Sequence, residues 1–541
     1  MQKPSSNLVV RLLEAVLLCL AAVFFALHYV HLAADFPNFS PWMDWSKYTD
    51  EGWYGDAAIR YFQWGHWYVA GDFNPATALP VWPFLEGILF QFTGVSLIAA
   101  RALTVTVFEG ILVCSWLLLR RWRPGNTSLA PATAVFLLAV SPFCFVFTRL
   151  AILEPLLILL MLLALLFAGR IGEGLARLFP VIGLGVLIPA MILTKTTALF
   201  LLPSIFWLVF AGVEYRPRRF VRVALPVCGL ALALWLLWMG LILHGHYMLD
   251  YRYLFSANGY TQISRANALS VLHDTFADGM WMGKIFFPAA MLAVAVAAIR
   301  WRRLRDYPLV PALLLWAAGY TAFLAYHNNL QPRYYLVVAV PLTLLLPVML
   351  ELWLLGRLGL SPRGASLRGV ALAGAAILIG AIGVQDAAEM FGYLRHPEYT
   401  LVRAARQLHQ YIAEDRSRDS QHSPLVLSIS GSNLSLMTGL HSINDDFGTL
   451  ELVNRVGQYR PGWYAAWNQI DDDKMEALAP YYRVERVATF SAMDDPDRNQ
   501  LVLYRLNDET EPTPPRRPSK PVPLSFRAKV GQEPSTIQRK H

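Results

Sequence analysis

Two adjacent carboxylates, Asp50 and Glu51, lie in a polar stretch that follows the first long apolar run of the chain. Neighbouring residues do not share one face of a helix. One carboxylate can therefore face a reacting hydroxyl as a general base while the other binds a metal ion or the backbone. The alternative is a solvated loop turn, and these two residues by themselves favour that simpler interpretation.

A third acid, Glu154, stands directly before Pro155 at the start of another apolar run, five positions after Arg149. A carboxylate at the edge of the hydrocarbon is costly, and such a group is usually functional or paired. Glu154 therefore either takes part in chemistry or forms a local ion pair with Arg149.

Two isolated bases, Lys195 and Arg333, lie in short breaks between apolar runs. Lys195 either contacts an anionic substrate or extends its ammonium toward lipid head groups. Arg333 suits a bidentate phosphate contact, or it anchors the chain at the membrane surface together with Tyr334 and Tyr335. Acids and bases on one membrane face could move a group off a phosphate, because an acid can act as general base and the bases can stabilise the leaving phosphate.

The composition places these residues in a membrane protein. The chain has 541 residues, of which 55% are hydrophobic and 16% charged, whereas soluble domains carry about 25% charged residues. The four cysteines lie in apolar runs without metal-ligand spacing, so we expect no disulfide framework. Apolar runs predict about eleven spans, near residues 8–33, 99–119, 130–148, 151–169, 179–194, 196–213, 222–243, 284–299, 308–326, 335–355 and 369–385.

Arginine marks every second loop between these spans, which is typical of cytoplasmic loops. The arginines that show this pattern are Arg120, Arg121 and Arg123; Arg170 and Arg177; Arg216, Arg218, Arg219 and Arg222; Arg300, Arg302, Arg303 and Arg305; and Arg357, Arg363 and Arg368. We therefore expect a cytoplasmic N-terminus. The basic residues are explained as topology signals, and nucleic acid is not an expected partner. The first run, of about 25 residues, is too long for a cleaved signal peptide and is expected to stay as a helix.

The same topology predicts three parts. Residues 1–385 form a helical membrane domain that carries a large external loop, 34–98. Residues 386–508 form a small external α/β domain, and the tail 509–541, with many Pro, Lys and Arg residues, is expected to be disordered. In the external domain, apolar patterning predicts a helix over Leu401–Ile412, strands at Pro424–Ile429, Trp463–Trp467, Tyr482–Phe490 and Gln500–Leu506, and a helix near Asp473–Leu478.

At the acidic and basic residues described above, the chain resembles the GT-C-fold glycosyltransferases that use lipid-linked sugars. It is most similar to the protein O-mannosyltransferases and the bacterial transferases that add aminoarabinose to lipid A. The ordered motifs are Asp50-Glu51, Arg149 with Glu154-Pro155, Leu193-Thr194-Lys195 running to Pro203, and Pro332-Arg333-Tyr334-Tyr335 running to Pro341. The resemblance covers residues 8–385. Many relatives have Asp where Glu154 stands, and Pro75–Pro83 lacks their basic or His residue.

The resemblance implies a transferase that moves a sugar from a polyprenyl-phosphate donor to an acceptor hydroxyl on the external face, with inversion and with Asp50 as the general base. Glu51 and Glu154 would be further catalytic acids or ligands of a divalent cation, Mg²⁺ or Mn²⁺. The donor phosphate would be bound by Lys195, Arg333, Tyr334 and Arg149.

The implied acceptor is a protein, a lipid or a glycan, and the implied location is a bacterial inner membrane with the C-terminal domain in the periplasm. A transporter or flippase of a lipid-linked or anionic substrate is the main alternative. A sensor whose external domain binds a ligand is another. A transporter would place its charges near the middle of the membrane and would often show repeated halves. The acidic and basic residues of these motifs are instead expected at one membrane face, and the sequence shows no internal repeat.

Overall fold

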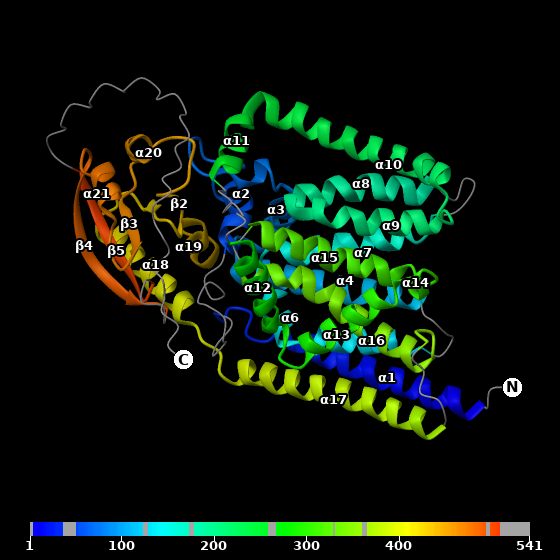
Figure 1. Ribbon diagram of the computed structural model, residues 1–541. Helices are drawn as coiled ribbons and strands as arrows, with labels where there is room; N and C mark the ends of the chain where they lie inside the picture. The colour runs from blue at the N-terminus through cyan, green and yellow to red at the C-terminus, as the bar shows by residue number, and fades with distance from the viewer. Residues whose placement is uncertain are drawn as a thin grey trace.

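The computed structural model describes residues 4–35, 50–122, 128–171, 178–257, 267–327, 331–359, 365–493 and 498–508. A bundle of helices lies on one side and a small domain with a sheet on the other (Figure 1). The bundle elements are α1 (Pro4–Leu27), α4 (Leu97–Arg121), α5 (Ala130–Val140), α6 (Pro142–Phe147), α7 (Leu153–Ala168), α8 (Leu178–Thr194), η4 (Thr196–Leu201), α9 (Leu202–Gly212), α10 (Pro217–Trp238), η5 (Met239–Tyr247), α11 (Met248–Ala257), α12 (Ala268–Ala277), η6 (Asp278–Met282), α13 (Phe286–Ile299), α14 (Trp301–Leu304), α15 (Leu309–His327), η7 (Pro332–Tyr335), α16 (Leu336–Leu354) and α17 (Ala365–Arg395).

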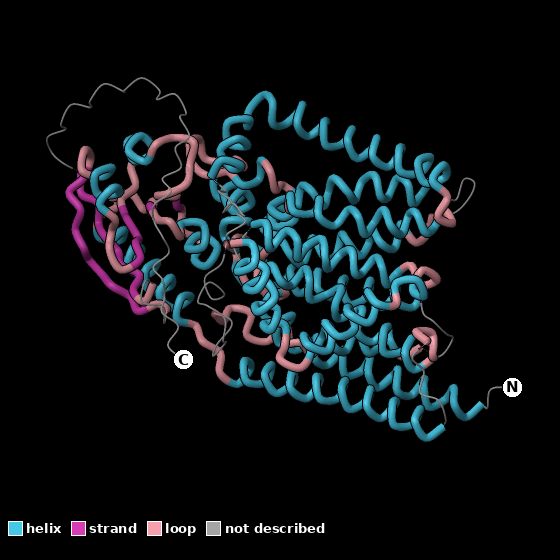
Figure 2. The backbone as a smooth tube through the Cα atoms, in the orientation of Figure 1, coloured by secondary structure: helices cyan, strands magenta, loops and turns pink. Residues whose placement is uncertain are grey.

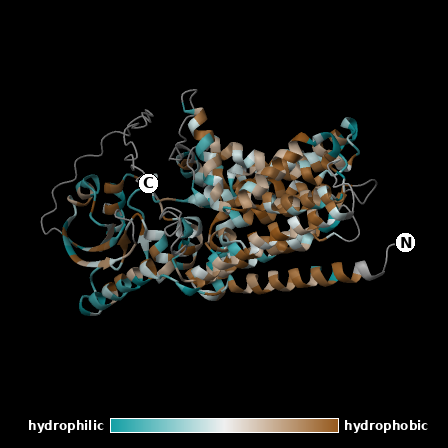
Figure 3. Cartoon of the chain, turned by 60° about the horizontal axis from the view of Figure 1, so that its bottom comes forward, coloured by the Kyte–Doolittle hydropathy of each residue, from teal (hydrophilic) through white to brown (hydrophobic). Residues whose placement is uncertain are grey.

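Each of the eleven predicted spans coincides with one of these helices or with a consecutive pair. In the described part of the chain, six helical stretches are long and apolar enough to cross a membrane, and five further apolar helices have 10–17 residues. The bundle carries most of the apolar residues of the chain (Figure 3). The fold class of a polytopic helical membrane protein is therefore confirmed, while the number of crossings stays a prediction.

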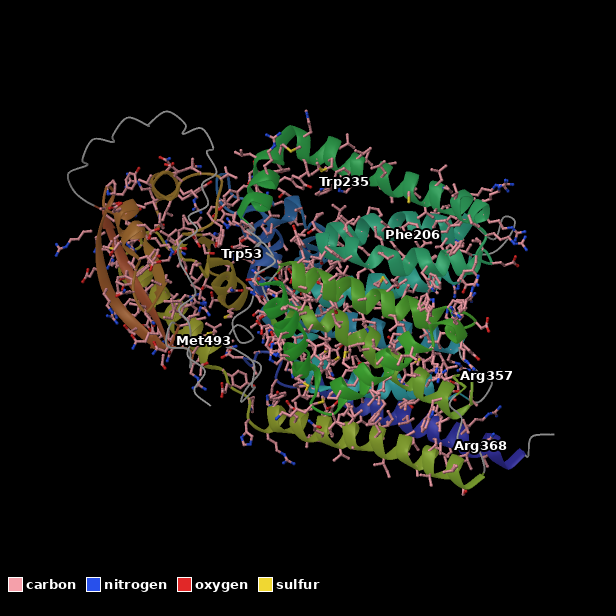
Figure 4. The ribbon with its side chains drawn as sticks, in the orientation of Figure 1. Trp53, Phe206, Trp235, Arg357, Arg368 and Met493 are labelled. Atoms are coloured by element: carbon pink, nitrogen blue, oxygen red, sulfur yellow. The ribbon has the colours of Figure 1, made fainter. Side chains whose placement is uncertain are left out.

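The two ends of the bundle differ in what they carry. Arg357 and Arg368 lie near the chain's N-terminal end, whereas Trp53 lies at the opposite end, next to the domain that contains Met493 (Figure 4). The arginine-rich loops and the sheet domain thus lie at opposite ends of the bundle, as the alternating charge pattern predicts. The direction in which this bundle crosses a membrane stays a prediction. Arg123, Arg177, Arg363 and the tail 509–541 lie outside the described residues.

The loop between α1 and α4 contains α2 (Glu51–Trp64), η2 (Pro75–Thr77) and α3 (Val81–Thr93). Helix α2 ends at Gly65, whose positive φ of 75° suits glycine in a left-handed cap. Helix α3 is apolar on most sides, so its pattern does not distinguish it from the start of a span.

The C-terminal domain is built on a five-stranded sheet in the order β2-β1-β3-β5-β4 (Figure 2). Its elements are α18 (Thr400–Arg418), β1 (Val426–Leu427), α19 (Gly431–Thr438), β2 (Ser442–Ile443), α20 (Leu452–Tyr459), β3 (Trp463–Trp467), α21 (Asp472–Leu478), β4 (Tyr482–Ser491) and β5 (Gln500–Asp508). Strand β1 is parallel to β2 and β3, whereas β5 is antiparallel to β3 and β4.

Helices cover both faces of this sheet. In β3, Trp463 packs on the side of α18, while Tyr464 packs on the side of α20 and α21. A strand that is covered on both faces has no polar alternation, which explains why Trp463–Trp467 consists of aromatic residues and alanine. The predicted strands and helices of this domain are found, and β2, α19 and α20 are additional elements.

Buried charges attach the C-terminal domain to the loop between α1 and α4. Asp72 of the loop accepts hydrogen bonds from Arg455 Nη1 at 2.8 Å and from Arg60 Nη2 at 2.7 Å. It also accepts from the backbone N–H of Asn444, at 3.1 Å. Arg60 is held as well by Asp56, with 2.5 Å between Nε and Oδ2. Since Arg455 and Asn444 belong to the C-terminal domain, one carboxylate joins two parts of the chain that are far apart in sequence.

Replacing Asp72 with alanine should strongly destabilise the folded protein. The change leaves the buried guanidinium groups of Arg60 and Arg455 without this carboxylate, and breaking a buried ion pair costs about 3–5 kcal/mol. The measurement is the thermal unfolding midpoint in detergent. The matched control is Asp446→Ala, since Asp446 is exposed. Equal midpoints for the two variants would contradict the role assigned to Asp72.

Glu86 of α3 is a second unusual charge, because it is fully buried against α2. A Cβ placed on Gly55 would lie 2.4 Å from Glu86 Oε2, so the two helices approach closely at this point. Neither carboxylate oxygen of Glu86 has a hydrogen-bond partner among the described residues. Burial, aided by the negative charge of Glu51, raises the pKa of Glu86 well above its ordinary value.

The variant Glu86→Gln should therefore be more stable than the wild type at neutral pH. The folded protein keeps the Glu86 proton at pH values where the unfolded chain has lost it, so wild-type stability falls as pH rises above about 4.3, the ordinary pKa of glutamate. Glutamine removes this dependence. Unfolding midpoints measured from pH 5 to pH 8 should fall less in Glu86→Gln than in the wild type. The exposed control, Glu476→Gln, should follow the wild-type curve.

Candidate active site

Asp50 and Arg333, which are 283 positions apart, form an ion pair with 2.6 Å between Oδ2 and Nη2. Asp50 is the N-cap residue of α2. Arg333 follows Pro332 in the short helix η7, at the start of α16. The Arg333 side chain is 6% exposed and that of Asp50 is 37% exposed. The carboxylate is therefore accessible while the guanidinium is held in the protein.

Glu51 points to a different partner, as expected for neighbouring residues of a helix. Its carboxylate receives a two-pronged contact from Arg101 of α4, with Nε–Oε1 at 2.8 Å and Nη2–Oε2 at 2.6 Å. The backbone N–H of Ala151 also donates to Oε1, at 2.8 Å. Arg101 Nη1 donates in addition to the carbonyl groups of Leu32 and Ala34. Glu51 is thus a buried support for the first turn of α2.

Glu154 and Lys195 form the second ion pair of the site. Glu154 lies in the first turn of α7, where the positive end of the helix favours an acid. Lys195 has an extended backbone conformation and lies between α8 and η4. Its ammonium donates to Glu154 Oε1. Both residues are buried. The local pair of Glu154 with Arg149 that the sequence left open is therefore not formed.

The aromatic ring of Tyr334 brings the two ion pairs together. The Lys195 ammonium lies 4.1 Å and the Arg333 guanidinium carbon 5.1 Å from the centre of this ring. Tyr54, one turn after Asp50 in α2, has its ring centre 5.8 Å from the same guanidinium carbon. Four of the predicted site residues, together with Tyr334, thus form one cluster at the end of the bundle that faces the C-terminal domain.

Arg149, which the sequence assigned to the donor phosphate, has other neighbours. Its Nη2 donates to the carbonyl of Val30 at 2.5 Å, and its guanidinium lies 4.3 Å from the ring centre of Phe145. These contacts join the segment before α7 to the end of α1. A role of Arg149 in phosphate binding stays a prediction.

Two residues that support this site were missed from the sequence. They are Arg101 and Tyr54. Arg101 could have been found, because a single arginine inside an apolar span usually indicates a functional or paired residue. Tyr54 carries no such signal, since aromatic residues are common at membrane surfaces.

Of the two carboxylates proposed as metal ligands, Glu51 has both oxygens occupied, whereas Oε2 of Glu154 has no hydrogen-bond partner among the described residues, so a divalent cation at Glu154 stays a prediction. Arg101 and the Ala151 amide occupy both oxygens of Glu51, and Lys195 donates to Glu154. A cation beside these acids would face the charges of both bases. Within the described ranges, no three or more His, Cys, Asp and Glu side chains gather in a way that could hold a metal ion.

Comparison with solved structures identifies the fold. No protein-family model and no curated protein sequence matches the chain. The structure is similar to that of ArnT from Cupriavidus metallidurans bound to undecaprenyl phosphate, with a TM-score of 0.57, 15% identity, and coverage of 91% of this chain and 97% of that one. It is also similar to the archaeal oligosaccharyltransferase AglB from Archaeoglobus fulgidus in complex with an inhibitory peptide and a dolichol-phosphate. That match has a TM-score of 0.51 and 12% identity, and it covers 92% of this chain and 74% of that one.

Both matches extend over the helical bundle and the C-terminal part, since each covers more than nine-tenths of this chain. At these identities the likeness establishes the fold, and it confirms the architecture that the ordered motifs implied. The chain has the GT-C fold of membrane glycosyltransferases.

Proposed function

We propose that this protein transfers a sugar from a polyprenyl-phosphate carrier to a hydroxyl group of an acceptor. The observation that carries the proposal is the joining of the Asp50–Arg333 and Lys195–Glu154 pairs around Tyr334 at one end of a GT-C bundle. Two solved structures with this fold contain undecaprenyl phosphate and dolichol-phosphate, respectively. These ligands support a lipid phosphate as the anion that the two bases would meet.

In the proposed reaction Asp50 accepts the proton of the acceptor hydroxyl. The hydroxyl oxygen forms a bond to the anomeric carbon as the bond from that carbon to the phosphate oxygen breaks. The bonding electrons leave with the polyprenyl phosphate, and attack from the opposite face inverts the anomeric configuration. Lys195 and Arg333 stabilise the charge that grows on the departing phosphate.

The ion pairs explain how Lys195 and Arg333 can stay buried and charged before the substrate binds. A buried ammonium or guanidinium without a partner would cost several kcal/mol, and here Glu154 and Asp50 supply the opposite charge. A phosphate group offers Arg333 an alternative acceptor. Asp50 is then released from its strongest donor at the moment when the donor sugar is bound, and it can face the acceptor.

A transporter or flippase remains the competing function. Charges that serve transport lie near the middle of the membrane, whereas Asp50, Glu154, Lys195 and Arg333 all lie at helix starts or breaks at the same end of the bundle. This placement favours chemistry at one membrane surface. We further propose that the surface is the periplasmic face of a bacterial inner membrane, and that residues 386–508 contribute to the choice of a protein, lipid or glycan acceptor.

The variant Asp50→Asn should lose transfer while remaining folded. Asparagine keeps an oxygen that can accept from Arg333 but cannot take up a proton, and a general base contributes about 10²–10⁴-fold to the rate. The assay measures release of polyprenyl phosphate from a panel of polyprenyl-phosphate sugars, with a membrane extract supplying acceptors. The control is Asp274→Asn, an acid in α12 whose side chain is 48% exposed.

Activity of Asp50→Asn equal to that of the control would refute the assignment of the base. No release from any donor by folded wild-type protein would instead favour the transporter or the sensor.

The double variant Lys195→Met/Glu154→Gln should chiefly weaken use of the donor. Removing both charges avoids leaving one buried ion alone, so the protein should fold. A hydrogen bond to a charged group is worth about 1.5–3 kcal/mol, so the KM for the donor should rise about 10- to 100-fold. Lys284→Met, at an exposed lysine before α13, is the control. An unchanged KM in the double variant would indicate that Lys195 has a structural role only.

A further inference from the structure

The first turn of α2 lacks the cap that its own sequence could supply. Asp50 is the N-cap residue, and an aspartate there usually accepts a hydrogen bond from one of the first N–H groups of the helix. Those N–H groups have no partner within the helix itself. The Asp50 side chain makes no such bond and instead accepts from Arg333.

The missing acceptor comes from the C-terminal domain. Oδ1 of Asn433 accepts the backbone N–H of Gly52 at 2.7 Å, between buried residues that are 381 positions apart. Gly52 is the second residue of α2, which is the position that an N-cap side chain would serve. Asn433 lies in α19, so the cap of α2 is provided by another helix of another domain.

The backbones of α2 and α19 touch at this point. A Cβ on Gly52 would lie 2.3 Å from the carbonyl carbon of Ser432 and 2.4 Å from the nitrogen of Asn433. Glycine at position 52 is thus required by the close approach. One turn later, Ser432 Oγ donates to Asp56 at 2.6 Å. The Asn433 side chain is therefore held in a tightly packed contact.

The same two helices also meet at their other ends, which provides an internal comparison. Gln63, in the last turn of α2, donates to the carbonyl groups of Gly439 and Leu440 at 2.9 and 3.2 Å. This contact joins the same domains through the same helix. It lies three turns away from Asp50, so its loss should weaken docking without changing the first turn.

We propose that Asn433 is a positioning residue, which caps α2 in place of Asp50 and so keeps the Asp50 carboxylate directed at Arg333 and the reacting hydroxyl. This proposal rests on the proposed function, in which Asp50 is the base. Asn433 has no contact with substrate in this role. Without it, Asp50, as the N-cap residue, would offer its carboxylate to the Gly52 N–H and turn back toward its own helix.

The test compares Asn433→Ala and Asn433→Asp with Gln63→Ala in the full-length protein. In Asn433→Ala, the Asp50 carboxylate should populate two positions, one that caps α2 and one that faces the reacting hydroxyl. A capping bond of ordinary strength predicts that kcat falls about tenfold. The KM for the donor should stay unchanged, because Lys195 and Arg333 are untouched.

The other variants separate positioning from simple destabilisation. Asn433→Asp keeps an acceptor oxygen for Gly52 and should restore most of kcat. Gln63→Ala should lower the unfolding midpoint about as much as Asn433→Ala, while leaving kcat as in the wild type. If Asn433→Ala does not fold, Asn433→Ser, whose hydroxyl can serve as a short cap acceptor, takes its place. It should show a smaller fall in kcat, again with an unchanged KM for the donor.

Two results would overturn the inference. One is an unchanged kcat in Asn433→Ala while Asp50→Asn is inactive, which leaves the proposed function standing. The other is an equal loss of kcat in Asn433→Ala and Gln63→Ala, which would indicate a general effect of domain docking. Full activity of Asp50→Asn, by contrast, would show that the proposed function itself has failed.

Discussion

A single buried guanidinium, that of Arg101, holds together the segments on which the site depends. It donates to the end of the first helix through the carbonyl groups of Leu32 and Ala34, and to α2 through Glu51. Glu51 in turn accepts from the amide of Ala151, just before α7. The direction of α2, and with it the position of Asp50, is therefore fixed by a network of hydrogen bonds between Arg101, Glu51 and the backbone groups around them. Arginine suits this role because its donors are arranged in a rigid plane.

This constraint explains how so many charges are tolerated at the end of an apolar bundle. Glu51, Glu154 and Asp50 each have a basic partner, and each partner lies on a different element: Arg101 on α4, Lys195 before η4, and Arg333 on η7. The cost of removing the charges from water is offset by short contacts and further hydrogen bonds. Such a network also ties the helix ends to one another. The site is thus part of what holds this end of the bundle together.

Much of the architecture could be predicted because it follows from local patterns. Span lengths and alternating arginines indicated the bundle, and strands such as Trp463–Trp467 were visible as short apolar runs between turns. The motif residues Asp50, Glu154, Lys195 and Arg333 could be named because ionisable groups at the edge of an apolar run are rare. The roles of these residues in catalysis stay predictions.

What the sequence could not provide was the choice of partners. Glu154 has Arg149 as a base five positions away, yet it pairs with Lys195, 41 positions away. Asp72 and Asn433 are ordinary polar residues in sequence, and their partners lie 383 and 381 positions away. Pairings of this kind depend on how the bundle and the domain are arranged in space, and no periodicity encodes them. Strand β2, with two residues, is too short to show a pattern.

The dependence of α2 on a domain near the end of the chain has a consequence for biosynthesis. Gly52 is made 381 residues before Asn433. At a synthesis rate of about 5–20 residues per second, Asn433 is added roughly 20–80 s after Gly52, so the first turn of α2 lacks its cap during that time. During this interval Asp72 also lacks Arg455. A nascent or truncated chain that has inserted its helices therefore lacks both contacts. Docking of the C-terminal domain can therefore complete the surroundings of Asp50 only after the whole membrane domain has been synthesised.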